Sequence, residues 1–118
     1  MRASVIRRHP SPLRYPGGKQ KVANYIKLLW LRNGFDGFEY VEPYAGGASV
    51  ALTLLYEGYA SRIHINDLNR GVYAFWHAVL NETDRLVERV RNVRLSMAEW
   101  RRQQAVQRSA SPDPFDLA

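Results

Sequence analysis

The chain has 118 residues, of which 46% are hydrophobic, so it is long and apolar enough for one modest folded domain and is not a disordered tail. Lysine and arginine number 17 against 11 acidic residues, and the net charge of +6 suits either a polyanionic partner or an ordinary solvated surface. The absence of cysteine excludes disulfides and thiolate metal sites and is consistent with a cytoplasmic location. No stretch approaches the roughly 20 apolar residues of a membrane span.

The N-terminal third is expected to run from a flexible arm through a loop into a helix. Residues 1–11 are basic and polar, and we expect them to form the arm. Leu13 to Lys19 is a loop with a Pro-Gly-Gly centre. Apolar side chains then recur at helical spacing, and Asn33-Gly34 follows as the stop signal. The members of this apolar face are Val22, Tyr25, Ile26, Leu29 and Trp30.

Two short strands are predicted on either side of a buried helix. The first strand is Tyr40–Glu42, and it is followed by a turn containing Gly46 and Gly47. The apolar run 48–56 then predicts a buried helix, and 63–65 is the second strand. Two strands make a thin sheet, which indicates a piece of a larger domain.

A long helical region is expected from Asn69 onward, with an apolar stripe that continues to Leu95. Ser96 and Glu99 have the spacing of a capping box and predict the start of a further helix. Asp113-Pro114 predicts one more helix start with proline at its first position. The stripe comprises Val72, Phe75, Trp76, Val79, Leu80, Val87, Val90 and Leu95.

The order of these elements is typical of the opening of a doubly wound, Rossmann-like α/β domain with a helical C-terminal extension. The turn between the first strand and the helix would let a ligand approach the backbone closely, because its glycines carry no Cβ. Asp67, about 20 residues later, has the position of an acid that accepts hydrogen bonds from ribose hydroxyls. The alternatives are an ordinary Gly-Gly turn and an N-cap role for Asp67.

The loop ahead of the first strand carries an aromatic residue and a cation on either side of its glycine pair. Tyr15 could cover a ligand with its ring, and Lys19 could pair with a carboxylate. A helix-entry loop with a solvated lysine is the alternative. The three histidines have no metal-ligand spacing, so no metal site is predicted. The three tryptophans are expected to pack in the core or between helices.

Three segments and their order along the chain form a specific pattern. They are Pro-Leu-Arg-Tyr-Pro-Gly-Gly-Lys at 12–19, Val-Glu-Pro-Tyr-Ala-Gly-Gly-Ala-Ser at 41–49, and Ile-Asn-Asp-Leu-Asn at 65–69. Together they resemble the D12-class, Dam-like DNA adenine-N6 methyltransferases, over nearly all of 12–118. The resemblance implies S-adenosylmethionine as cofactor, double-stranded DNA as partner and a role in DNA methylation or restriction–modification. Ala48 departs from the family pattern, in which glycine is frequent. The cofactor contacts that the resemblance implies are Tyr15, Lys19, Glu42, Pro43, Gly46, Gly47 and Asp67.

The family's catalytic tetrad, Asp-Pro-Pro-Tyr, does not occur in these 118 residues. Residues 113–116 lack its second proline and are better explained as a helix start. We therefore expect no catalytic residue in this chain and no activity from it alone. The resemblance divides the chain into the arm 1–11, a cofactor-binding part 12–95 and the helical start of a truncated target-recognition region, 96–118.

Two other functions stay open at this stage. The first is a non-catalytic DNA-binding remnant or regulatory fragment that uses arginines along 85–108. The second is a fragment of a nicotinamide-dependent oxidoreductase, against which the missing G-x-G-x-x-G pattern argues.

Overall fold

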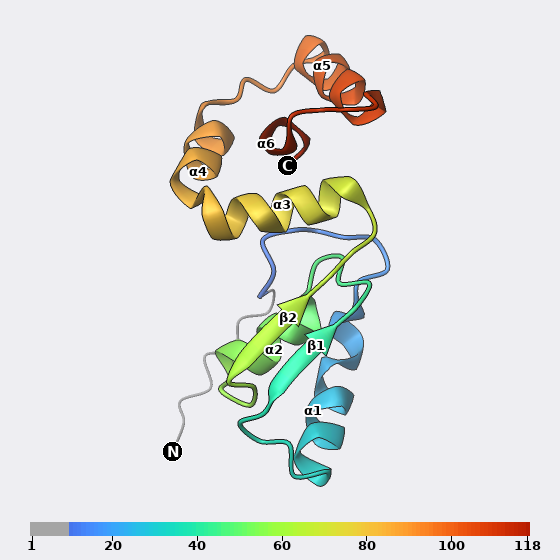
Figure 1. The fold of residues 1–118 in the computed structure, drawn as a ribbon, viewed down its shortest axis with the longest axis vertical. Coiled ribbons are helices and arrows are strands. Elements are labelled where there is room, and N and C mark those ends of the chain that lie inside the picture. Colours follow the sequence, from blue (N-terminus) through green and yellow to red (C-terminus); the bar gives the residue numbers. More distant parts are fainter. Residues whose placement is uncertain (1–9) are drawn as a thin grey trace. The chain divides into compact units, whose positions relative to one another are not determined.

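A parallel pair of strands makes up the sheet in residues 10–118, the part of the chain that the computed structural model describes. β1 (Glu39–Glu42) pairs with β2 (Arg62–Ile65), with Tyr40 opposite Ile63 and Glu42 opposite Ile65 (Figure 1). Parallel strands need a crossover connection, and α2 (Ser49–Tyr56) lies between them in sequence. The structure therefore confirms the predicted α/β class, with two strands and six α-helices among the described residues.

The core of the first unit, which ends at Asp67, lies on one face of this sheet. A 3₁₀ turn, η1 (Lys19–Val22), leads into α1 (Ala23–Arg32), which ends at the predicted Asn33-Gly34. Ala23 of α1 is buried in this core together with Val50 and Leu54 of α2. The cluster comprises Ala23, Val50, Leu54 and Ala60, with Ile26, Trp30, Tyr40, Tyr59 and Ile63 packed against it.

The other face of the sheet is polar. Glu39 stands opposite Arg62 in the register, and its carboxylate lies 3.5 Å from that guanidinium and 2.8 Å from His64 Nε2. Val41 shares this face and is 65% exposed. Because side chains alternate along a strand, Tyr40 and Glu42 point to the helix-covered side instead. Glu42, the last residue of β1, therefore lies on the helix-covered side of the sheet, against the start of α2.

Four helices form the second unit, which begins at Leu68. They are α3 (Arg70–Asn81), α4 (Thr83–Asn92), α5 (Met97–Arg108) and α6 (Pro114–Leu117) (Figure 1). Side chains cap three of their starts, at Asn69, Ser96 and Asp113, each accepting from backbone N–H groups of the first turn. The helix starts predicted at 69, 96 and 113 are thereby confirmed.

The helical region predicted beyond Asn69 consists of two helices. Glu82 leaves helical geometry, with φ −134°, and separates α3 from α4. The apolar stripe is not buried along its whole length, because Leu80 near the end of α3, Val90 in α4 and Leu95 after α4 are 73%, 67% and 90% exposed. The stripe holds for Val72 and Trp76, which are buried.

The two units meet in sequence between Asp67 and Leu68. The division at residues 95 and 96 that the family resemblance implies stays a prediction. Most of the predicted arm, residues 1–9, lies outside the described residues.

Candidate cofactor site at the carboxyl edge of the sheet

The glycine turn after β1 is closely covered by the front loop. A Cβ on Gly46 would fall 2.8 Å from Tyr15 Cδ1, and one on Gly47 would fall 2.8 Å from the Leu13 carbonyl oxygen. Both glycines are buried, and Gly46 has φ +50°. These glycines are therefore required by the approach of the front loop as well as by the turn itself.

Two residues other than glycine in the turn adopt left-handed backbone conformations. Tyr44 has φ +55° and Ala48 has φ +50°. Ala48 immediately precedes α2 and is fully buried. The left-handed conformation costs an L-residue roughly 1–2 kcal/mol, which gives a physical reason for the glycine that the family pattern has at this position. The turn thus keeps its shape at an energetic cost that the surrounding packing must offset.

Lys19 connects the front loop to the strand and the turn. Its Nζ donates to the Tyr44 carbonyl at 2.6 Å and to Glu42 Oε1 at 3.3 Å. The Lys19 side chain is 43% exposed, whereas that of Glu42 is 3% exposed. Tyr15 and Lys19, predicted as one loop site, are therefore both brought onto the turn that follows β1.

Asp67 is the second residue after β2 and binds the same turn. Its Oδ2 accepts a hydrogen bond from the Gly46 N–H at 2.9 Å. The N-cap of α3 is Asn69, whose Oδ1 accepts from the N–H groups of Gly71 and Val72. The alternative in which Asp67 caps the next helix is therefore wrong.

The parallel register explains how these segments converge. Glu42 and Ile65, the last residues of the two strands, are paired, so the segments that follow them leave the sheet at one edge. The Ala45 N–H donates to the Asn66 carbonyl oxygen at 2.9 Å and joins the two segments. The residues gathered here are Tyr15, Lys19, Glu42, Gly46, Gly47 and Asp67, with Pro43 adjacent in the turn.

A hollow of about 610 Å³ lies beside the front loop, within the size range of small-molecule sites. Tyr15, Gly18 and Ser49 line it, whereas Lys19 and Asp67 do not. Gln20 also lines it, and the buried Oε1 of this residue has no hydrogen-bond partner among the described residues. Sequence reasoning missed Gln20, because nothing in the motif distinguishes its carboxamide from a solvated one.

Tyr44 is a second residue that the sequence reasoning left out as a named contact. The residue is 78% exposed, although its carbonyl oxygen accepts a hydrogen bond from Lys19. The sequence did contain a signal for this residue, since Tyr44 occupies the aromatic position that follows the proline of the turn. An exposed aromatic face beside Lys19 can cover a planar ligand.

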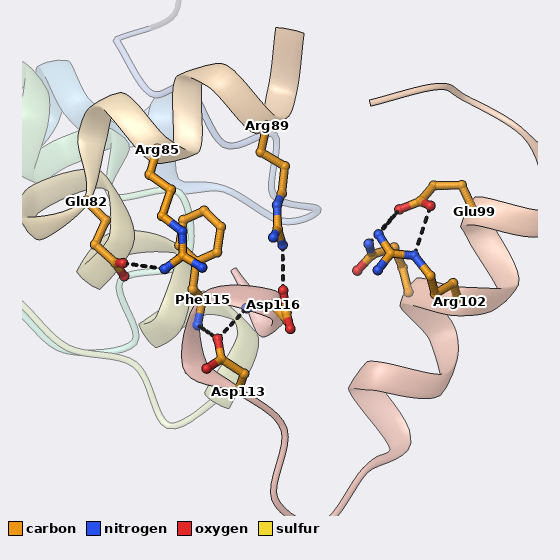
Figure 2. Close-up of polar contacts among 9 residues, drawn as sticks. Glu82, Arg85, Arg89, Glu99, Arg102, Asp113, Phe115 and Asp116 are labelled. Atoms are coloured by element: carbon orange, nitrogen blue, oxygen red, sulfur yellow. Dashed lines mark hydrogen bonds and ion pairs between the residues drawn. The ribbon is translucent and has the colours of Figure 1, made fainter. Parts of the chain in front are cut away.

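Arginines of the second unit hold the segment around Phe115. Figure 2 shows the Arg85 guanidinium against the Phe115 ring, 3.7 Å from its centroid, and Arg89 paired with Asp116 at 2.6 Å. This ion pair holds the pKa of Asp116 below its usual value. Phe115 is 4% exposed. Arg85 and Arg89, which the sequence leaves as candidates for DNA binding, therefore have structural contacts within the chain.

A groove of about 650 Å³ runs between α4 and α5, and both charge signs line it. Glu99 lies in it and binds Arg102 through both carboxylate oxygens, which together with Gln103 lowers the pKa of Glu99 to about 2 (Figure 2). The groove is therefore a mixed-charge surface and not a uniformly positive one.

Two classes of site are not seen in the described residues. Over residues 10–118, no group of three or more histidine and acidic side chains is placed to hold a metal ion. No helix within the same range has the length and apolar character to cross a membrane.

Residues 15–106 match the family model of the D12 class N6 adenine-specific DNA methyltransferases. This match covers more than half of the chain, and the chain belongs to that family. The resemblance predicted from the three motifs is confirmed.

A curated relative is the type II methyltransferase M.MjaIII of Methanocaldococcus jannaschii. It is 29% identical over 97 residues, which cover 78% of this chain and 34% of the relative. The chain thus spans about a third of the length of the relative. No solved structure matches the chain.

Proposed function

We propose that this chain forms the S-adenosylmethionine-binding part of a DNA adenine-N6 methyltransferase with a doubly wound, Rossmann-like fold. The observation that carries the proposal is the convergence of three separated segments, the front loop, the glycine turn and Asp67, at one edge of a parallel sheet. Family membership independently favours this cofactor and a DNA substrate. A DNA substrate also supports the predicted cytoplasmic location.

The residues present suit the chemistry of the cofactor. S-adenosylmethionine supplies an electrophilic methyl group on sulfonium, and the protein has to bind and orient it. Asp67 offers a carboxylate for ribose hydroxyls, and Lys19 offers an ammonium for the methionine carboxylate. Lys19 has three N–H donors, two of which are used by Glu42 and Tyr44. One donor is left for a ligand without breaking either contact.

The other proposed contacts follow from position. Tyr15 would cover the ligand, and Pro43, Gly46 and Gly47 would offer backbone groups at the turn, with Glu42 near the methionine end. Because Gly46 and Gly47 are buried under the front loop, a ligand that contacts their backbone would require this loop to shift. We therefore expect cofactor binding to alter the environment of Tyr15 as well as that of the turn.

Methyl transfer itself is expected to need the family's Asp-Pro-Pro-Tyr tetrad, which does not occur in these 118 residues. The adenine amino nitrogen is a poor nucleophile, and an acidic side chain and a backbone carbonyl are needed to accept its hydrogens. We infer that residues 12–67 bind the cofactor, that 68–118 lead towards target recognition, and that the chain alone does not methylate DNA.

A non-catalytic DNA-binding role is the second candidate. Among the described residues, Arg91, Arg94, Arg101 and Arg108 have no acidic partner, and they favour it. The ion pairs of Arg85, Arg89 and Arg102 argue against a dedicated phosphate-binding face. Salt-dependent DNA binding without cofactor binding would distinguish this role.

The test is an NMR titration of the labelled chain with S-adenosylmethionine at up to millimolar concentration, with a nicotinamide dinucleotide as the control ligand. The expected result is a saturable shift of the Gly46, Gly47 and Asp67 amide signals with the methyl donor alone. If these amide signals do not shift with the methyl donor, or shift equally with both ligands, the proposed cofactor site is wrong. Methyl incorporation into DNA by this chain would overturn the proposal that it is inactive alone.

A further inference from the structure

Glu42 is the most deeply buried charged side chain in the described part of the protein, with the residue 2% exposed. A buried carboxylate is costly unless hydrogen bonds and an opposite charge compensate it. Both of its oxygens have such partners, and the partners belong to two different segments of the chain. Glu42 therefore connects two segments of the chain through its carboxylate.

One oxygen of Glu42 binds the start of α2. Oε2 accepts a hydrogen bond from the Ala51 N–H at 2.8 Å, and Ala51 is the third residue of the helix. The N-cap position holds Ala48, whose side chain cannot accept this bond. Glu42 supplies the missing acceptor from the preceding strand, and its negative charge lies at the positive end of the helix dipole.

The other oxygen of Glu42 binds the front loop through Lys19. Oε1 is 3.3 Å from Lys19 Nζ, which also donates to the carbonyl oxygen of Tyr44 at 2.6 Å. Tyr44 is held in a left-handed conformation, so this contact also stabilises the strained part of the turn. Glu42 is hidden from solvent, whereas the Lys19 side chain is 43% exposed. A ligand can reach the ammonium but not the carboxylate behind it.

We propose that Glu42 is a positioning residue that acts on the cofactor only through Lys19 and the start of α2. This inference rests on the proposed function in that it refines the role of one residue in the same pocket. Glu42 holds the Lys19 ammonium at the edge of the sheet and accepts a hydrogen bond from the first turn of α2. The ligand then contacts Lys19 and not the Glu42 carboxylate.

The substitution E42Q separates these two tasks. The glutamine amide oxygen can still accept from the Ala51 N–H, but the side chain no longer carries a charge for Lys19. E42A removes both interactions and serves as the second variant, with E42Q remaining interpretable where E42A fails to fold. K19M removes the ammonium from the same pair and allows a double-mutant cycle.

The first measurement is the dissociation constant for S-adenosylhomocysteine, a ligand that retains the amino-acid end of the cofactor. It is determined by calorimetry for the wild-type chain, E42Q, K19M and the double variant. We expect E42Q and K19M each to weaken binding about tenfold, as for loss of one charge-assisted hydrogen bond. We expect E42Q to add almost nothing in the K19M background. An undiminished effect of E42Q in that background would mean direct contact and would overturn the proposal.

The second measurement needs no ligand. Hydrogen exchange at the Ala51 amide should be fast in E42A and close to wild type in E42Q, and the E42Q and K19M effects on urea unfolding should be non-additive. Unchanged Ala51 exchange in E42A, or additive unfolding effects, would overturn the positioning role. If the wild-type chain binds no cofactor while these results hold, the proposed function fails and the Glu42 linkage stands.

Discussion

The carboxylate of Asp67 accepts a hydrogen bond from the backbone N–H of Gly46 at 2.9 Å, across 21 positions of sequence. This contact ties the segment after β2 to the turn after β1. An acid that holds the turn and also faces a ribose would combine structural and binding roles. Substitution of Asp67 therefore affects both, and a control is needed to separate them.

We predict that D67A weakens cofactor binding by roughly tenfold to a hundredfold, because a charge-assisted acceptor is lost. The matched control is N69A, which removes the N-cap of α3 two residues later and should cost about 1 kcal/mol of stability with little effect on binding. Calorimetric titration and urea unfolding of both variants check this. Equal binding losses in the two variants would mean that Asp67 acts only through folding.

The second prediction concerns the approach of Tyr15 to Gly46. G46A combines left-handed strain with a Cβ 2.8 Å from the Tyr15 ring, so it should displace the front loop. G34A is the matched control, because Gly34 also has positive φ, at +72°, but has no atom within 4 Å of the added Cβ. The control should lose about 1 kcal/mol from strain alone.

G46A should lose more stability than G34A in urea unfolding, and Tyr15 should become more accessible to chemical modification in G46A only. A smaller loss in G46A than in G34A would contradict the close packing of the front loop on the turn.

The third prediction concerns Phe115. F115A should destabilise the second unit by about 3 kcal/mol, since a buried aromatic side chain is lost. F115L retains most of the apolar volume but loses the aromatic ring that the Arg85 and Arg89 guanidinium groups contact. It should therefore lower the free energy of unfolding by about 1 kcal/mol. Urea unfolding followed by tryptophan fluorescence measures both. Similar losses in the two variants would show that the arginine contacts, and not burial, dominate.

The fourth prediction is a pH effect of Tyr40. Burial, with a contribution from the Glu42 carboxylate, raises the pKa of Tyr40 to about 12 from its usual value of 10.0. The folded state therefore holds the phenolic proton more tightly than the unfolded state. This contribution to stability is complete below pH 10 and is lost as the pH rises towards 12.

Y40F should lose less stability than the wild-type chain between pH 10 and 12, and Y25F, at an exposed position of α1, should follow the wild type. Denaturant midpoints measured across this range check the difference. A parallel decline of all three proteins would exclude Tyr40 as the titrating group.

The sequence predicted what is decided locally. Caps such as Ser96 and Asp113, and the stop at Asn33-Gly34, act within a few residues, so the structure places these boundaries where they were expected. The break at Glu82 was not predictable from periodicity, because Leu80 looks like a core residue until the packing leaves it exposed. Secondary structure thus followed from short-range signals.

The contacts within the candidate site depend on longer-range geometry. The motifs identified Lys19, Glu42 and Asp67, but not that Glu42 would bind Lys19 and the Ala51 N–H at once. That arrangement depends on which side of β1 faces α2. Likewise, the sequence left the arginines of α4 as candidates for DNA binding, whereas Arg85 and Arg89 contact the ring of Phe115, which lies 26 to 30 positions further along the chain. Cofactor contacts at these residues stay predictions.

The two-stranded sheet has a consequence for handling the chain. Within residues 10–118 each strand pairs with one neighbour, so the outer side of each strand has backbone groups that another strand can bind. Strand addition of this kind joins separate molecules, and it becomes more frequent as the concentration rises. Dilute samples and a dispersity check by light scattering are therefore appropriate before any titration.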